Sequence, residues 1–240
     1  MIRLSILGYG KMGKEIEKIA LKSGLEILAK IDNETDWQQQ HTAFLKSDVA
    51  IEFSTPNTVI DNLFRCFEAH IPVVCGTTGW AQKEQEILAH CKETSNSLIF
   101  GSNFSIGANL FFKINELTAQ MMNKQSQYDV MVEETHHTAK KDAPSGTAIT
   151  AANIIVNQLD RKKGWVLQDD SNADNINIVA HRIGDVTGIH EVHYQSGADR
   201  ITLRHEAFNR AIFAEGAVRS ALWLPQHPGI YHFNDIFLQI

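Results

Sequence analysis

The beginning of the chain constrains the fold more than any other part of it. Residues 2–7 form a short, mostly apolar run that is typical of a buried strand. A glycine turn, Gly8-Tyr9-Gly10-Lys11-Met12-Gly13, follows at once, and residues 14–23 carry apolar side chains at helical spacing. A second apolar run ends at Asp32, about twenty positions after the turn. This order of strand, glycine turn, helix and acidic residue is the fingerprint of a dinucleotide-binding unit.

The residue types suggest how a dinucleotide would be held and which one is preferred. Glycines allow a tight turn and a close approach of the pyrophosphate, and the Asp32 carboxylate accepts hydrogen bonds from ribose hydroxyls. A carboxylate followed by the neutral Asn33 repels the 2′-phosphate of NADPH, so the sequence predicts a preference for NADH. Lys11 is the one nearby cation that could compensate, which leaves NADPH as an alternative cofactor. The competing interpretation is an ordinary glycine turn without a ligand.

Strand-like and helical segments alternate through the first hundred residues. Strands are expected at 49–53, 71–75 and 97–100, with helices at 57–70 and 82–94 between them. Such alternation predicts a parallel, doubly wound sheet of the Rossmann type, with its ligand beyond the carboxyl ends of the strands. Two turns fall there and supply further candidate cofactor contacts: Gly76, Thr77, Thr78, and Gly101, Ser102, Asn103, Phe104. Small residues also occur in such turns simply as punctuation between elements.

Residues 133–148 contain the largest concentration of potentially catalytic side chains in the chain. A strand at 128–135 leads into a loop with His136, His137 and Lys140, and a helix is expected to start near residues 142–145, with Pro144 in its first turn. The free N–H groups around Gly146 and Thr147 would then form an anion site. Histidine is a general acid near neutral pH, and a lysine supplies positive charge. The stretch therefore suits a small anionic substrate that must receive a proton, unless it is only a polar surface loop.

The pattern Glu-x-His-His-x-x-Lys-x-Asp-x-Pro-Ser-Gly-Thr, which starts at Glu134, resembles the signature of the dihydrodipicolinate reductase family. The resemblance implies NADH- or NADPH-dependent reduction of the dicarboxylate 4-hydroxy-tetrahydrodipicolinate, with loss of water, in lysine and diaminopimelate synthesis. It implies His136 as acid/base, Lys140 rather than Lys141 as proton donor, and substrate binding by His137, Gly146 and Thr147. The first glycine turn departs from the family, because many members have one more residue there.

The remainder of the chain predicts a second, α+β domain. A helix at 107–122 leads into it, and strand-like runs at 176–183, 189–194 and 200–206 join the strand at 128–135 in a four-stranded mixed sheet. The polar residues 160–175 are expected to form an exposed connection. His190, His193 and His205 lack metal-ligand spacing and are assigned to core or interface positions. The expected division is residues 1–106 plus 214–240 for the dinucleotide and 107–213 for substrate binding and assembly, by the resemblance as a homotetramer.

Composition excludes several other classes of protein. The net charge of −6 argues against broad nucleic-acid binding, and three cysteines without a CxxC pair argue against a disulfide framework or a zinc site. No segment has the length of a membrane span, so a cytoplasmic protein without a metal is expected. Two rivals stay open. Another amino-acid-pathway dehydrogenase would have no reason for the His-His-x-x-Lys and Pro-Ser-Gly-Thr pattern, and a non-enzymatic dinucleotide sensor would need no proton donor.

Overall fold

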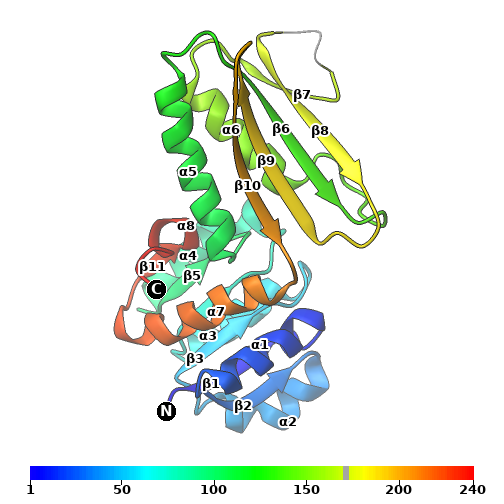
Figure 1. The fold of residues 1–240 in the computed structure, drawn as a ribbon. Coiled ribbons are helices and arrows are strands. Elements are labelled where there is room, and N and C mark those ends of the chain that lie inside the picture. The colour runs from blue at the N-terminus through cyan, green and yellow to red at the C-terminus, as the bar shows by residue number, and fades with distance from the viewer. Residues whose placement is uncertain (170–172) are drawn as a thin grey trace. The chain divides into compact units, whose positions relative to one another are not determined.

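The computed structural model describes residues 1–169 and 173–240, and the chain divides into two compact units (Figure 1). The first unit consists of Met1–Ile106 and Arg210–Ile240, and the second consists of Gly107–Asn209. The chain therefore returns to the first unit at Arg210, directly before a helix, and not at residue 214 as the sequence suggested.

The first unit is a six-stranded parallel sheet with helices on both faces, which confirms the doubly wound fold. Its strand order is β11-β5-β4-β3-β1-β2. The elements before the second unit are β1 (Arg3–Leu7), α1 (Lys11–Lys22), β2 (Glu26–Ile31), α2 (Glu34–Phe44), β3 (Val49–Glu52), α3 (Val59–Glu68), β4 (Val73–Cys75), the short 3-10 helix η1 (Ala81–Lys83), α4 (Glu84–Glu93) and β5 (Leu98–Phe100). Those after it are α7 (Ala211–Trp223), the 3-10 helix η2 (Leu224–Gln226), β11 (Ile230–His232) and α8 (Phe233–Ile236).

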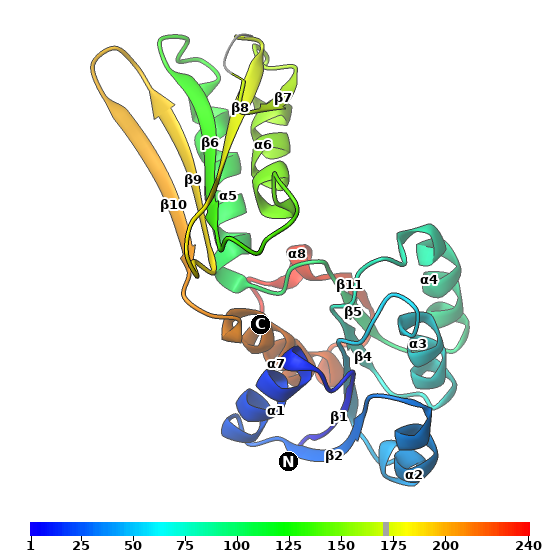
Figure 2. The same cartoon turned by 90° about the vertical axis from the view of Figure 1, so that its right-hand side faces the viewer.

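Alternation along the buried strands produces two separate apolar layers. Successive side chains of a strand point to opposite faces, so Ile6 packs with α1 and α7 on one side, whereas Leu7 packs with α2, α3 and α4 on the other. Figure 2 shows the two sets of helices on either side of the sheet. Both helix α2 and strand β11 were missed from the sequence. Helix α2 buries only Trp37 and Phe44 and so has little amphipathic pattern, and β11 is three residues long.

The second unit is a mixed sheet covered by two helices. Its elements are α5 (Ile106–Met122), β6 (Asp129–His136), α6 (Gly146–Gln158), β7 (Gly164–Leu167), β8 (Asn175–Arg182), β9 (Gly188–Gln195) and β10 (Arg200–Ala207). The strand order is β10-β9-β6-β8-β7, in which β6 and β9 are antiparallel, as are β9 and β10, while β6 and β8 are parallel, as are β7 and β8.

The predicted count of four strands is wrong, because β7 lies within the segment expected to be an exposed connection. The indole Nε1–H of Trp165 donates to Asn153 Oδ1 of α6 at 3.1 Å, and the Lys162 ammonium donates to the carbonyl of Ala173 at 2.7 Å. These contacts dock β7 against the rest of the unit. Its four residues are flanked by charged and polar residues, which conceal a strand of this length from pattern reading.

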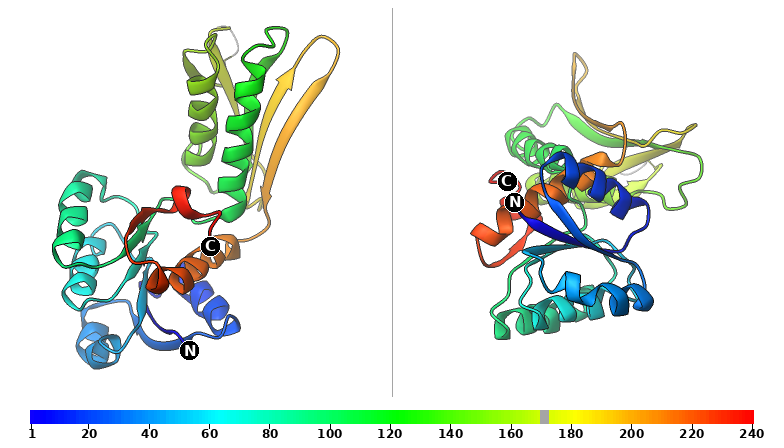
Figure 3. Two further views of the ribbon diagram at one scale, coloured as in Figure 1. Left: turned by 90° about the vertical axis from the view of Figure 1, so that its left-hand side faces the viewer. Right: turned by 90° about the horizontal axis from the view of Figure 1, so that it is seen from below.

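Helices α5 and α6 lie on one face of this sheet (Figures 2 and 3). The inward row of β6 starts with Val130 and Val132, which are buried in the apolar core that these helices share with the sheet. The same two-residue period places Glu134 and His136 on the helix side, where both are buried. The core pattern of a single strand thus carries two titratable groups inward.

Candidate active site

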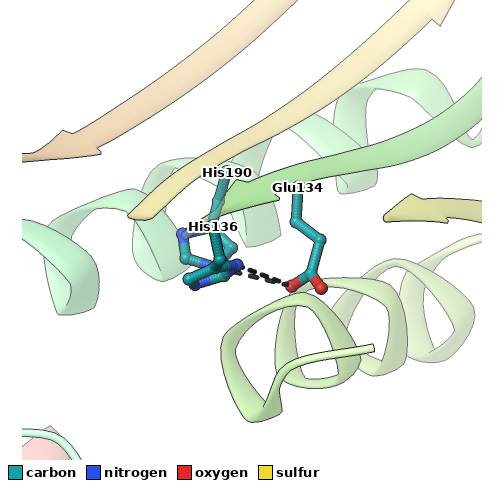
Figure 4. Close-up of side chains that lie close together, drawn as sticks. All are labelled: Glu134, His136 and His190. Atoms are coloured by element: carbon teal, nitrogen blue, oxygen red, sulfur yellow. Dashed lines mark ion pairs between the residues drawn. The ribbon is translucent and has the colours of Figure 1, made fainter. Parts of the chain in front are cut away.

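The inward end of β6 holds a cluster of titratable side chains. His136 is the last residue of the strand and is 8% exposed, so the expectation that it lies in a loop is wrong. Its Nδ1 lies 3.6 Å from Glu134 Oε2, and His190 Nε2, from β9, lies 3.9 Å from the same oxygen (Figure 4). The two imidazole rings are 5.0 Å apart between centroids. The buried Glu134 carboxylate thus lies close to two histidines, one from its own strand β6 and one from the antiparallel neighbouring strand β9.

Glu134 is fully buried, and its charge is compensated by several donors. The Ser145 backbone N–H approaches both carboxylate oxygens, at 3.2 and 3.1 Å, and Arg182 Nη2 donates to Oε1 at 3.0 Å. Buried charges are tolerated where they are paired and hydrogen-bonded in this way. The same Arg182 guanidinium also donates to the carbonyl of Asp142, which ties the loop after β6 to β8. Sequence reasoning had given no role to Glu134 or Arg182, because their adjacency depends on the pairing of β6 with β8.

Ser145 connects this carboxylate to His190. The Ser145 Oγ accepts the Ala148 N–H at 3.3 Å as the N-cap of α6 and lies 3.2 Å from His190 Nε2. Burial lowers the pKa of His190 to about 3, so this imidazole is neutral at ordinary pH. The Ser145 hydroxyl and His190 Nε2 share this hydrogen bond, and its direction depends on which ring nitrogen carries the proton. His190 is a core residue, as expected, and it also supports the start of a helix.

The N-terminus of α6 offers room and free donors for an anion. The helix begins at Gly146, so Pro144 precedes the cap and does not occupy the first turn as predicted; the Ser145 side chain fixes that boundary. Within the described residues, the backbone N–H groups of Gly146 and Thr147 have no hydrogen-bond partner. A Cβ added to Gly146 would meet nothing within 4 Å, so the space in front of the turn is open. Free N–H groups and the helix dipole together favour a carboxylate there.

Lys140 is in the loop between β6 and α6 and is paired with a neighbour. Its Nζ lies 2.7 Å from both carboxylate oxygens of Asp142, and its backbone N–H donates to the His137 carbonyl at 3.1 Å. Its side chain is 21% exposed, whereas Lys141 is exposed. The ammonium of Lys140 holds the pKa of the Asp142 carboxyl below its usual range.

Burial lowers the pKa of His136, while the Glu134 carboxylate opposes that shift, and the charges of Lys140 and Arg182 reinforce it. Burial and several neighbouring charges of both signs thus act together on the protonation of this imidazole. Groups tuned in this way are candidates for proton transfer.

In the described ranges, two groups of side chains could hold a metal ion, because the ligand-type atoms within each group all lie within 4.8 Å of one another. The first group is Glu134, His136 and His190, and the second is Glu133, Glu191 and His193. The first group has Arg182 bound to its only carboxylate and Lys140 nearby, and these positive charges disfavour a further cation. In the second group, on the other face of the sheet, Glu191 is already paired with Arg204 at 3.0 Å. We therefore assign the first group to proton chemistry, and the expectation of no metal site stays a prediction.

The glycine turn of the first unit is closely packed at two points and open at a third. Gly8 has φ +90°, and a Cβ there would lie 2.2 Å from the Phe53 carbonyl oxygen. A Cβ on Gly13 would lie 2.3 Å from the Gly8 carbonyl oxygen, whereas one on Gly10 would meet nothing within 4 Å. Asp32 Oδ1 accepts the Tyr9 N–H at 2.7 Å and so braces the turn. This is the arrangement that lets a pyrophosphate approach the backbone at Gly10.

A cavity of about 150 Å³ lies beside Asp32, and one of its lining side chains is positively charged, which the sequence did not reveal. Arg65, from α3, lines it together with Gly8, Asn33 and Glu34. The Arg65 Nη2 lies 2.9 Å from Glu34 Oε2, and the guanidinium stacks over the Trp37 ring at 4.7 Å. No local pattern could have found Arg65, since its place in the cavity depends on how α2 and α3 pack. Lys11 is therefore not the only cation available near this end of the sheet.

The other predicted cofactor contacts lie around two further cavities of the first unit. Met12, Gly76, Thr77 and Thr78 line a cavity of about 240 Å³. Another, of about 180 Å³, is lined by residues that include Thr77, Thr78, Gly101 and Ser102. Phe104 is only 1% exposed as a whole residue, and its ring packs against Phe233 with ring centroids 4.4 Å apart. Asn103 Oδ1 accepts the Ser105 N–H at 2.9 Å and shapes the same turn.

Comparison with known proteins gives matches along almost the whole chain. Residues 2–104 match the family model for dihydrodipicolinate reductase, N-terminus, and residues 107–237 match the one for dihydrodipicolinate reductase, C-terminus. A curated 4-hydroxy-tetrahydrodipicolinate reductase from Christiangramia forsetii is 41% identical over 235 residues, covering 98% of this chain and 97% of that protein. One of the same name from Methanoculleus marisnigri is 32% identical, covering 98% and 99%.

A solved structure extends the match to three dimensions. Dipicolinate-bound dihydrodipicolinate reductase from Paenisporosarcina sp. TG-14 superposes with a TM-score of 0.80 at 26% identity, covering 98% of this chain and 99% of that one. No helix among the described residues has the length and apolar character that crossing a membrane requires.

Proposed function

The chain belongs to the dihydrodipicolinate reductase family, and from this premise we propose that its two units divide the family's reaction between them. The enzyme is an NAD(P)H-dependent oxidoreductase of lysine and diaminopimelate synthesis. We propose that the first unit holds the dinucleotide and the second holds (2S,4S)-4-hydroxy-2,3,4,5-tetrahydrodipicolinate. Loss of water would give a C=C bond conjugated with the C=N bond of the ring, the bound dinucleotide would supply a hydride to that ring, and the resulting enamine carbon would receive a proton to give tetrahydrodipicolinate.

One observation carries the assignment of the substrate site. Glu134 contacts both the imidazole of the proposed acid/base, His136, and the Ser145 cap of the helix that would bind the carboxylate. The buried Glu134 carboxylate thereby fixes the position of His136 relative to the proposed anion site at the N-terminus of α6. The resemblance first read from residues 134–147 is confirmed at the level of the family. The relative that carries dipicolinate, an aromatic dicarboxylate related to the product ring, supports a dicarboxylate as the ligand.

Within this site we assign roles residue by residue. His136 is the acid/base, because it combines burial with a carboxylate on Nδ1 and leaves Nε2 for the substrate. Lys140 supplies positive charge to the dicarboxylate and acts as the proton donor that the family pattern implies. Gly146 and Thr147 bind one substrate carboxylate through their free N–H groups, and His137, half-buried beside His136, contributes to the same binding.

For the cofactor, we propose NADH as the preferred reductant, with NADPH accepted. Asp32 can accept hydrogen bonds from both ribose hydroxyls and repels a 2′-phosphate. Arg65 could offset part of that repulsion, although it is paired with Glu34. The phosphates would lie at the turn Gly8–Gly13, and the nicotinamide end near Gly76–Thr78 and Gly101–Phe104.

We also propose a cytoplasmic homotetramer assembled through the second unit. The face of its sheet away from α5 and α6 carries rows of paired side chains, such as Glu133 with His181 at 3.1 Å and Glu191 with Arg204 at 3.0 Å. Natural proteins usually cover an open sheet of this kind, and a second copy of the chain would do so.

Inhibition by pyridine-2,6-dicarboxylate (dipicolinate) tests this function against its rivals. The proposal predicts inhibition that is competitive with the dicarboxylate substrate and is weakened by changes at Gly146. An aspartate or homoserine dehydrogenase would reduce its own substrate and ignore this inhibitor, and a dinucleotide sensor would bind NADH without turnover. Either result would remove the proposed function.

A further inference from the structure

We propose that Glu134 is a positioning residue for the reaction: its carboxylate favours a proton on His136, directs the Nε2 of that imidazole toward substrate, and fixes the helix start that binds the substrate carboxylate. This inference rests on the proposed function, because it assumes that His136 gives up a proton during turnover.

The geometry places one carboxylate at the junction of two elements. Oε2 faces Nδ1 of His136 at 3.6 Å, while Oε1 accepts from Arg182 at 3.0 Å. Both oxygens face the N–H of Ser145, the residue that caps α6. A displacement of Glu134 would therefore disturb both the proton donor and the anion site. No other carboxylate in the described part of the chain contacts both.

The orientation of His136 follows from its unpartnered nitrogen. Nδ1 is buried and has no hydrogen bond among the described residues, so only the Glu134 carboxylate is near enough to favour a proton on it. A Cβ on Gly188 would lie 3.2 Å from Nε2, so the glycine makes room for the far side of the ring. With Nδ1–H directed to Glu134, Nε2 is the nitrogen left to transfer a proton. A carboxylate on one ring nitrogen commonly orients an imidazole in this way.

The surrounding charges leave Glu134 as the main group that favours the imidazolium. Arg182 on β8 and Lys140 in the following loop both oppose a further positive charge on His136. Asp142 favours it, but its carboxylate is largely engaged with Lys140. His190 on β9 is neutral, and burial lowers the pKa of His205 on β10, which lies with its ring 6.4 Å from that of His190. Helix α6 contributes only the polar Ser145 at this point.

The direction of the pH effect follows from the sign of this interaction. A general acid works only while it carries its proton, so turnover should be present below the pKa of His136 and lost as the pH rises through it. Replacing Glu134 by Gln removes the carboxylate that raises this pKa and leaves Arg182 and Lys140 in place. The alkaline limb of the kcat–pH profile should therefore move to lower pH by about one unit or more, the usual effect of one close opposite charge.

The test combines NMR with kinetics on the full-length protein. The His136 pKa is measured from imidazole resonances of histidine-labelled wild type and Glu134→Gln, with His136→Asn used to assign the signal. Glu133→Gln is the matched control, because it removes the neighbouring carboxylate on the opposite face of β6. We expect a lower His136 pKa and a displaced kcat profile in Glu134→Gln and neither change in Glu133→Gln.

The possible outcomes separate the two hypotheses. An unchanged His136 pKa in Glu134→Gln overturns the positioning role, whatever the kinetics show. A lowered pKa with an unmoved kcat profile supports the effect of Glu134 on the imidazole but contradicts the proposed role of His136 as the acid/base. If Glu134→Gln does not fold, Glu134→Asp takes its place. This substitution keeps the negative charge but moves the carboxylate one methylene away from His136. It should lower the His136 pKa by less than Glu134→Gln does, and it should raise KM for the dicarboxylate. A His136 pKa in Glu134→Asp equal to that of wild type would overturn the inference.

Discussion

The ammonium of Lys140 lies 2.7 Å from both carboxylate oxygens of Asp142, which follows it by two positions. In the free protein this lysine is thus already paired with an anion. On the proposed assignment of Lys140, a dicarboxylate substrate would compete with Asp142 for the same positive charge, or share it.

Asp142→Asn should therefore strengthen binding of dicarboxylates. The substitution removes a negative charge beside the proposed substrate site and frees the ammonium, and Asp142 is exposed enough that screening limits the effect to roughly three- to tenfold in KM. Dipicolinate inhibition, measured at low and at high salt, checks this. An increase in KM would show that Asp142 is needed to place Lys140.

His136→Ala should lower kcat by about 10²–10⁴ and leave NADH affinity nearly unchanged. The imidazole belongs to the second unit, whereas the glycine turn belongs to the first. Steady-state kinetics, together with fluorescence titration of NADH, separate the two effects. A kcat equal to that of wild type would remove His136 from the mechanism.

Gly146→Leu should raise KM for the dicarboxylate strongly and weaken dipicolinate inhibition in parallel. A side chain at this position would start in open space, because a Cβ on Gly146 meets nothing within 4 Å. Gly197→Leu, a change at a similarly open glycine in the turn between β9 and β10, is the control and should leave both parameters unchanged. Equal KM values in the two variants would place the anion site elsewhere.

Cofactor choice should respond in opposite directions to two substitutions around the same cavity. Asp32→Ala should raise KM for NADH and reduce the difference between the KM values for NADH and NADPH, because the ribose contact is lost together with the repulsion of a 2′-phosphate. Arg65→Gln should raise KM for NADPH and leave that for NADH almost unchanged, because the guanidinium lines the cavity beside Asp32. Lower KM for NADPH than for NADH in the wild type would show that Arg65 or Lys11 outweighs Asp32.

Light scattering at micromolar concentration should report a tetramer. A monomer would contradict assembly through the second sheet. Glu191→Lys on the open face tests the surface directly. It replaces the partner of Arg204 by a like charge, so it should dissociate a tetramer that is built through this face.

The features that could be predicted from the sequence are those set by residues close together in the chain. Local patterns predicted the doubly wound sheet, since strand–turn–helix order is written in contiguous residues such as 2–23. They also marked His136, Lys140 and Gly146, which lie within one short stretch. The errors were local too. Helix α2 has few buried positions, β7 is hidden between polar residues, and Ser145 rather than Pro144 sets the start of α6.

The groups that sequence reasoning left out depend on contacts between distant residues. Arg182 reaches Glu134 across 48 positions because β8 pairs with β6, and His190 meets Ser145 across 45 positions. Arg65 lines the cavity beside Asp32 only because α3 packs beside α2. No periodicity or short motif encodes such pairs, so the part that Arg182 plays in the environment of His136 emerges only from the fold.

A coupled assay tests the central claim most directly. Wild type and His136→Ala are supplied with 4-hydroxy-tetrahydrodipicolinate generated enzymatically in the same cuvette, and oxidation of NADH and of NADPH is followed by nicotinamide absorbance. The account predicts substrate-dependent oxidation by the wild type, faster with NADH, inhibited by dipicolinate, and reduced about 10²-fold or more in the variant. No substrate-dependent oxidation of either cofactor by the wild type would contradict it.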